Sequence, residues 1–370
     1  MITIKTPIEY INQPDIHLIA GRYIKKYGKN ALIIGSKTSL EVIGTAFFEN
    51  LKEEEIQYEV ETFLGYPTFV TMKAYAKKAE ERKADVIIGI GGGKVCDTAK
   101  AAGTFAKLPV ITIPTIAATC ASWAAVSIVY NEKGQVEVPF SNDNSPVLLL
   151  ADTKIIAQAP SKYMYAGIVD TLAKWYETIP NLTIAPKDTT LSISLYGAKL
   201  AFDSLLKQGK QAVLDGQQGL VTKEVFDTID AILYLAGFVG SFQGDTFYGG
   251  FAHPFYNSST LISKTMGRLH GEKVSIGLLA QYILEKRSDE EIRELIHVLD
   301  KFHLALTLEE IGIQNEEETR IIAKDILKRF SNGYKQLSIA QTENEIVKAL
   351  WQADAIVKQT LKTKVLAGRY

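Results

Sequence analysis

The sequence predicts an α/β domain with a parallel sheet of the Rossmann-like type, followed by an all-helical domain. Three observations predict this. Apolar runs alternate with helical windows over the first 150 residues, a glycine-rich turn joins a strand to a helix at residues 89–94, and only helical windows follow residue 161. We place the boundary after residue 158, which gives domains of residues 1–158 and 159–370. The length fits, because single hydrophobic cores stop growing at about 250–300 residues.

The predicted strands are short apolar runs, which is typical of strands covered by helices on both faces. They lie at residues 31–34, 56–60, 85–90, 110–113, 126–130 and 147–150, and we expect them to form one sheet. The intervening helical windows cover residues 69–83 and 94–106. The second half has helical windows at residues 161–178, 186–206, 222–242, 270–286, 289–302, 317–330 and 343–361, with no convincing strand among them.

Composition excludes several classes of protein. Lys and Arg number 41 against 42 Asp and Glu, so there is no electrostatic footprint for nucleic acid or an anionic membrane. The N-terminus lacks the pattern of a signal peptide. The long uncharged run at residues 108–131 contains two prolines and splits into two β-type pieces, which favours buried strands over a spanning helix. We expect a cytoplasmic protein with neither nucleic acid nor membrane as a partner.

The turn Gly89-Ile-Gly-Gly-Gly-Lys94 lies where a strand becomes a helix. Glycines let backbone N–H groups approach a phosphate, and a helix N-terminus favours an anion. The pattern is neither a Walker A loop nor a strict GxGxxG. We therefore expect Gly91, Gly92, Gly93 and Lys94 to bind a diphosphate, against the alternative of a tight turn without a ligand. Asp97 follows on the helix, either to contact the cofactor or only to favour the helix dipole.

Histidine and carboxylate must supply any metal site, because two cysteines form neither a disulfide framework nor a four-cysteine cage. Asp170 lies in a largely apolar helical window, where a carboxylate is costly to bury unless it is paired or bound to metal. His253 lies in a segment rich in glycine and aromatics, and His270 opens another helix. One Asp and two His are typical of catalytic zinc or iron. Spacing alone leaves structural histidines as the alternative.

The motifs together resemble the iron-containing alcohol dehydrogenase superfamily, in its glycerol dehydrogenase-like branch. The resemblance rests on residues 89–100, 114–119, 166–170 and 252–253 and on His270-Gly-Glu-Lys-Val274, in this order. It implies a dehydroquinate synthase-like fold with cofactor and metal between the domains. It also implies that Asp170, His253 and His270 are the metal ligands. The cofactor contacts that it implies are Gly93, Lys94, Thr115, Ala118 and Tyr130.

The chain departs from the family pattern where glycerol dehydrogenases have an aspartate that contacts glycerol, because Cys120 stands there. The sequence around Cys120 resembles the hydroxycarboxylate dehydrogenase subgroup, which reduces 2-oxo acids. Lys174 follows Asp170 by one helical turn, so both project from the same face. We expect Cys120 to lie in the substrate pocket and Lys174 to hold a substrate carboxylate, against the alternative of a salt bridge to a neighbouring acid.

Two further departures concern the cofactor and the proton path. No acidic residue follows the strand at residues 31–34, where the family binds the adenosine ribose; Ser36 and Lys37 are present instead. A lysine attracts a 2′-phosphate, so we expect NADPH to serve at least as well as NADH. Tyr256 stands where the family commonly has a second histidine, so proton relay or substrate placement is expected to differ.

The sequence thus predicts a metal-dependent oxidoreductase that transfers hydride between NAD(P)(H) and a small 2-oxo or 2-hydroxy acid or a polyol. Zinc is the expected metal, with iron(II) as the alternative. Three other functions remain open: a glycerol dehydrogenase proper, a lyase of the dehydroquinate synthase type, and a non-catalytic nucleotide-binding sensor. Because family members commonly associate, we expect a homo-oligomer that acts on a small-molecule substrate.

Overall fold

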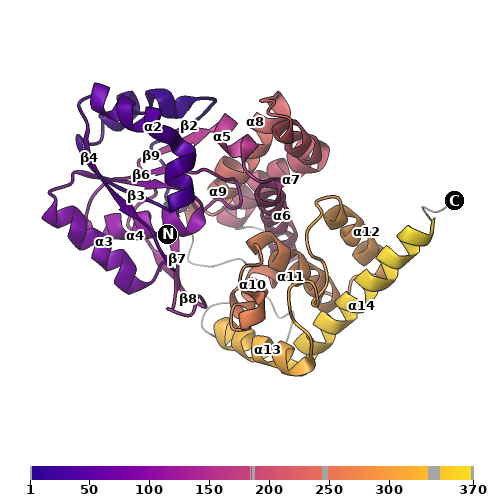
Figure 1. The fold of residues 1–370 in the computed structure, drawn as a ribbon. Coiled ribbons are helices and arrows are strands. Elements are labelled where there is room, and N and C mark those ends of the chain that lie inside the picture. The colour runs from indigo at the N-terminus through magenta and orange to yellow at the C-terminus, as the bar shows by residue number, and fades with distance from the viewer. Residues whose placement is uncertain (1, 184, 186–187, 244–248, 332–341, 368–370) are drawn as a thin grey trace.

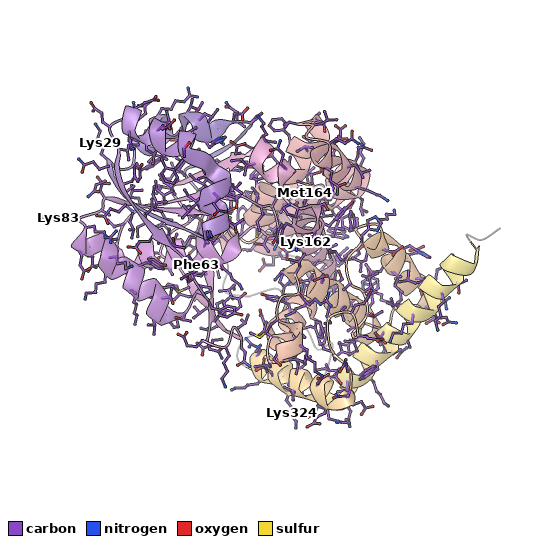
Figure 2. All side chains as sticks on the ribbon, viewed as in Figure 1. Lys29, Phe63, Lys83, Lys162, Met164 and Lys324 are labelled. Atoms are coloured by element: carbon purple, nitrogen blue, oxygen red, sulfur yellow. The ribbon has the colours of Figure 1, made fainter. Side chains whose placement is uncertain are left out.

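The structure is a computed structural model that describes the chain except residues 1, 184, 186–187, 244–248, 332–341 and 368–370. A strand-rich region, indigo to magenta in Figure 1, lies beside a region of helices that runs from magenta to yellow. Charged side chains such as Lys29, Lys83 and Lys324 lie on the outside, whereas Met164 is buried in the helical core (Figure 2). The predicted fold class is confirmed.

The main sheet has six strands in the order β2-β9-β6-β5-β3-β4, and every pair is parallel. Their bounds are β2 Glu9–Gln13, β3 Asn30–Gly35, β4 Gln57–Thr62, β5 Val86–Ile90, β6 Val110–Ile113 and β9 Leu148–Asp152. The helices that connect them are α2 Lys37–Glu53, α3 Phe69–Glu81 and α4 Gly93–Ala106, with the short η1 Ile16–Ile19 and α1 Gly21–Ile24 after β2.

The central strands are apolar throughout because both faces of the sheet are covered. Ile33 and Ile88 contribute to one hydrophobic cluster, while their neighbours Leu32 and Ile87 contribute to another. All five residues of β5 are buried. This explains why short uninterrupted apolar runs located the central strands in the sequence.

One strand prediction was wrong, and one strand of the main sheet was missed. The run at residues 126–130, β7 Val126–Tyr130, does not join the main sheet; it pairs antiparallel with β8 Val136–Ser141. The reason is the Lys100 amine, which donates to the carbonyls of Ala124 and Val126 and holds this segment against α4. The edge strand β2 was missed, because Glu9-Tyr-Ile-Asn-Gln13 is polar and only partly buried.

The helical region is built around α6 Ser161–Thr178, which packs against both α7 and α11. Its other elements are α5 Thr153–Gln158, η2 Ile179–Thr183, α7 Thr189–Gln217, α8 Lys223–Asp230, η3 Ala231–Leu235, α9 Ala236–Val239, α10 Ala252–Ser259, η4 Ser263–Thr265, α11 His270–Leu284, α12 Asp289–Asp300, α13 Glu316–Ser331 and α14 Glu343–Ala367. The short strands β1 Thr3–Ile4 and β10 Phe242–Gln243 pair with each other.

The window predicted as one helix at residues 222–242 is divided into α8, a π-helical segment and α9. Leu149 and Ala151 of β9 contribute to the helical core, so the two regions share a hydrophobic contact. The boundary after residue 158 lies between α5 and α6 and stays a prediction. None of the helices in the described part of the chain combines the length and apolar character needed to cross a bilayer.

Candidate metal and cofactor site

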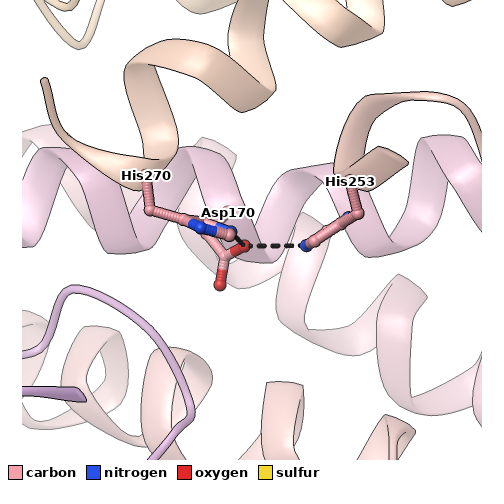
Figure 3. A group of neighbouring side chains, drawn as sticks. All are labelled: Asp170, His253 and His270. Atoms are coloured by element: carbon pink, nitrogen blue, oxygen red, sulfur yellow. Dashed lines mark hydrogen bonds and ion pairs between the residues drawn. The ribbon is translucent and has the colours of Figure 1, made fainter. Parts of the chain in front are cut away.

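The three predicted metal ligands lie together, although they come from three helices. Asp170 is in the middle of α6, His253 is in the first turn of α10, and His270 is the first residue of α11. Oδ1 of Asp170 lies 2.9 Å from Nε2 of His270 and 3.2 Å from Nε2 of His253 (Figure 3). One ligand atom from each residue falls within 4.8 Å of the others, and no second such group occurs among the described residues.

Two glycines of α11 allow the three helices to approach closely enough for this. A Cβ at Gly271 would lie 2.4 Å from the backbone oxygen of Ala166 in α6. A Cβ at Gly277 would lie 2.7 Å from the Cα of Ala252 in α10. Larger residues would therefore separate α11 from the helices that carry Asp170 and His253.

The electrostatics of the triad favour an ionised carboxylate. Asp170 is 2 % exposed, and burial alone would raise its pKa; the charges of His270 and Lys174 and the imidazole hydrogen bonds instead hold that pKa well below its usual value. Burial lowers the pKa of His270, which favours the neutral imidazole that metals bind. A carboxylate and two imidazoles are a donor set that suits divalent zinc or iron.

Glu177, which the sequence analysis missed, holds His253 in place. Its Oε1 accepts a hydrogen bond from the backbone N–H of His253 at 3.0 Å, and its Oε2 contacts Nδ1 of the same residue. A carboxylate only accepts, so Nδ1 donates to Glu177 and Nε2 donates to Asp170; a metal bound at Nε2 would take the place of the second hydrogen. Burial alone would lower the pKa of His253, but the carboxylates of Glu177 and Asp170 raise it to about 10. The spacing of Asp170 and Glu177 on one helix was the available signal.

The glycine turn forms the wall of a small pocket at the carboxyl ends of the parallel strands, where open α/β sheets bind ligands. Gly91 has a φ of +150°, and a Cβ at Gly92 would lie 2.8 Å from Ile116. Gly93 and Lys94 are the first residues of α4, whose free N–H groups favour an anion. The pocket is lined by Gly91, Gly92, Gly93, Cys96, Pro114, Ile116, Ala118, Thr119, Ala121 and Ser122.

The remaining predicted cofactor residues surround this turn. Thr115 is buried, and its N–H lies 3.4 Å from the carbonyl of Gly91. Ser36 caps α2 by accepting the N–H of Ser39, and Lys37 is exposed at the start of that helix. The Ser39 hydroxyl in turn donates to the carbonyl of Ile90, which places the start of α2 beside the turn.

Asp97 has a structural role as well as its predicted contact with the cofactor. Its carboxylate is buried, pairs with the Lys100 amine at 2.9 Å and accepts the N–H of Ile128. Lys100 also holds the carbonyls of Ala124 and Val126. The pair therefore fixes the loop that carries Cys120, and the contact of Asp97 with the cofactor stays a prediction.

Tyrosines connect the glycine turn with the triad. The Lys94 amine lies 4.4 Å from the centre of the Tyr66 ring and 5.8 Å from that of Tyr130. The hydroxyl groups of Tyr130 and Tyr256 are 2.8 Å apart, and the ring centres of Tyr256 and His270 are 4.0 Å apart. The residues predicted for the cofactor and those predicted for the metal thus form one continuous site.

Lys174 and Cys120 interact electrostatically with each other and with Asp170. The charges of Cys120, Asp170 and Glu177 raise the pKa of Lys174, although burial opposes them. Burial raises the pKa of the Cys120 thiol, which the Lys174 charge opposes. Lys174 forms no ion pair within 4 Å with a described carboxylate, although its amine forms a hydrogen bond with the Cys120 side chain, so no carboxylate competes with a substrate for the amine.

A profile of the iron-containing alcohol dehydrogenase family matches residues 7–153. Glycerol dehydrogenase of Citrobacter freundii is 32% identical over 326 residues, which is 86% of this chain and 88% of that protein. The chain belongs to the iron-containing alcohol dehydrogenase family. Hydroxycarboxylate dehydrogenase A of Escherichia coli is 37% identical over 251 residues, or 66% of this chain and 67% of that protein.

Solved structures of this family agree with the fold. The crystal structure of glycerol dehydrogenase from Schizosaccharomyces pombe superimposes with a TM-score of 0.87 and 25% identity, covering 98% of this chain and 92% of that one. The chain is thus an oxidoreductase of the glycerol dehydrogenase-like branch that acts on CH–OH groups with NAD and a divalent metal. These matches favour this family over the lyase and the non-catalytic sensor.

Proposed function

We propose that Asp170, His253 and His270 hold the catalytic metal of an enzyme that transfers hydride between NAD(P)(H) and a small 2-oxo or 2-hydroxy acid. The observation that carries this proposal is the convergence of three ligand atoms within 4.8 Å beside the tyrosines that lead to the glycine turn. A divalent metal held by these residues would polarise the substrate oxygen. The nicotinamide cofactor supplies or accepts the hydride, and the protein orients it.

The chain's own residues position both reactants. The N–H groups at the start of α4 and the Lys94 amine bind the diphosphate, next to Thr115 and Ala118. Glu177 keeps a hydrogen on Nδ1 of His253, which leaves Nε2 as the atom that would bind the metal. Tyr130 and Tyr256 share a hydrogen bond that holds a hydroxyl proton near His270 and narrows the access of water.

The proposal of an acid substrate depends on Lys174 and Cys120. Lys174 places a cation one turn from Asp170, where it can bind the carboxylate of a 2-oxo acid while the neighbouring carbonyl faces the metal site. Cys120 occupies the substrate pocket without the carboxylate that glycerol dehydrogenases use for glycerol. A polyol substrate is the second candidate, favoured by the 32% identity to a glycerol dehydrogenase over most of the chain.

The choice of cofactor and metal follows from the same residues. Ser36 and the exposed Lys37 offer no carboxylate to the adenosine ribose and one cation to a 2′-phosphate, so NADPH should serve at least as well as NADH. Comparison of the two Michaelis constants tests this, and a strong preference for NADH contradicts it. The carboxylate-imidazole set favours zinc, with iron(II) as the alternative. We further propose a homo-oligomer in the cytoplasm, with its domains divided after residue 158.

The test follows NAD(P)H absorbance with 2-oxo acids, dihydroxyacetone and glyceraldehyde, each with and without a chelator. We expect the fastest turnover on a 2-oxo acid, loss of turnover with the chelator and recovery with zinc or iron(II). Fastest turnover on dihydroxyacetone would identify a glycerol dehydrogenase instead. No turnover on any of these compounds would contradict the proposed function.

A further inference from the structure

Lys273, in the first turn of α11, is a buried amine without a partner. The residue is 3 % exposed, and its Nζ forms no hydrogen bond or ion pair with any described residue. Its neighbour Glu272 instead accepts the backbone N–H of Leu269. The amine lies 5.6 Å from the centre of the Tyr256 ring, and the Glu272 carboxylate acts on it only from beyond ion-pair distance. A buried cation with no carboxylate in contact is costly, which points to an anion that is bound in the working protein.

A second amine without a carboxylate lies nearby. Lys94 contacts the rings of Tyr66 and Tyr130 and forms no ion pair within the described part of the chain. Tyr130 and Tyr256 join their hydroxyls, so the two lysines lie at the two ends of one tyrosine pair. Burial lowers the pKa of Lys273 to about 8; the charge of Glu272 opposes this shift and repulsion by Lys94 adds to it. An anion bound between two like charges stabilises both of them.

The position of the two lysines identifies the anion. Lys94 comes from the strand-rich region, directly after the glycine turn that offers its N–H groups to a phosphate. Lys273 comes from the helical region, one turn after His270. Lys174 already offers a cation near Asp170 for a substrate carboxylate. The dinucleotide diphosphate, with two negative charges, matches two amines beside the turn.

We propose that Lys273 and Lys94 form an anion subsite with one lysine from each region, and that it binds the diphosphate of NAD(P)(H). Lys273 is then the contact through which the helical region recognises the cofactor. This inference rests on the proposed function, because it requires the dinucleotide. It adds a residue whose place in the His270-Gly-Glu-Lys273 motif does not by itself reveal a role.

The first experiment compares NADH binding by the wild type and Lys273→Met, using NADH fluorescence. Loss of a hydrogen bond to a charged group should weaken NADH binding roughly 10- to 100-fold. The KM of the 2-oxo acid at saturating cofactor should stay unchanged. The exposed Lys348→Met on α14 is the matched control and should bind NADH as the wild type does. An unchanged NADH affinity in Lys273→Met, or a change confined to the KM of the 2-oxo acid, overturns the proposal.

Folding is tested separately by the melting temperature. Because Lys273 is an unpaired buried cation, Lys273→Met should melt at the same temperature as the wild type or higher without cofactor. The increase in melting temperature caused by NADH should be smaller in the variant. A lower melting temperature without cofactor, together with a full NADH-induced increase, would make Lys273 a structural residue and overturn the proposal.

The double variant Lys94→Met/Lys273→Met tests whether both amines serve one anion. We expect the combined loss of NADH affinity to differ from the product of the two single losses, because residues that share one ligand group couple. Independent, multiplicative losses would contradict a shared diphosphate. If the wild type bound no dinucleotide, the proposed function itself would fail. If the wild type bound NADH and the variants bound it equally well, only this inference would fail.

Discussion

Glu177 accepts the backbone N–H of His253 at 3.0 Å, and the same carboxylate contacts Nδ1 of that residue. One side chain therefore fixes both the start of α10 and the orientation of the imidazole. Glu177 follows Asp170 by two helical turns on α6, with Lys174 between them. This face of α6 thus supplies a metal ligand, a cation for the substrate and the group that orients a second ligand.

Glu177→Gln should weaken metal binding by roughly 10- to 100-fold, the usual cost of losing a partner of a metal-bound histidine. Glutamine keeps one oxygen to accept the backbone N–H of His253, but its NH2 group would face Nδ1. Because that NH2 group donates, it favours the tautomer with the hydrogen on Nε2, which cannot bind metal through Nε2. Competition with a chelator measures the affinity. Glu290→Gln, at an exposed position on α12, is the control. Equal metal affinity in both variants would contradict this role.

Lys174→Met should raise the KM for a 2-oxo acid by about tenfold or more, because a charged hydrogen bond to the carboxylate is lost. The KM for the cofactor should stay within twofold of the wild-type value, a change of roughly 0.4 kcal/mol, because Lys174 is not expected to contact the cofactor. Steady-state kinetics with both substrates varied provide the measurement. The exposed Lys210→Met on α7 serves as the charge control. Unchanged kinetics on the 2-oxo acid would leave Lys174 with a structural role only.

Cys120→Asp should shift preference toward glycerol. The new carboxylate would lie beside Lys174, where it pairs with the amine and offers acceptors to polyol hydroxyls. We expect the ratio of kcat/KM for glycerol to kcat/KM for a 2-hydroxy acid to rise about tenfold or more, as expected for one charged contact. Cys120→Asn, of the same size without the charge, should not produce this shift. An equal shift in both variants would mean that pocket volume, not charge, decides.

The ionised Asp152 carboxylate is expected to stabilise the fold, and this stability should be lost in acid. Although burial opposes it, hydrogen bonds from His17 and the backbone lower the pKa of this carboxyl at the end of β9. The resulting stability is present above the unfolded pKa of about 3.9 and is lost as pH falls through the folded value. Asp152→Asn should cost about 1–3 kcal/mol at pH 7 and flatten the acid limb of an unfolding series. An unchanged acid limb would contradict this assignment.

Local patterns predicted the parts of the structure that depend on neighbours in sequence. Apolar runs located β3, β5, β6 and β9, and the glycine turn appeared where expected at the end of β5. The pairing of β7 outside the main sheet could not be predicted, because it depends on hydrogen bonds from Lys100 to two carbonyls more than twenty residues away.

The site shows the same division. Motifs and resemblance brought together Asp170, His253 and His270, which the structure places within one metal-sized group. Glu177 was missed because its partner lies 76 positions away. Lys273 belongs to a motif that the sequence shows. That its amine is buried without a carboxylate in contact depends on the packing of α11 and could not be predicted from the motif.

The most direct test of the account is the metal content of the protein after loading with zinc or iron(II) and removal of excess ion. The wild type should retain about one ion per chain, as expected for a single mononuclear site, and Asp170→Asn and His270→Ala should retain almost none. Their NADH binding should persist, because the glycine turn is intact. Full metal content in Asp170→Asn, or a wild type that turns over its substrate after complete removal of metal, would contradict the central claim.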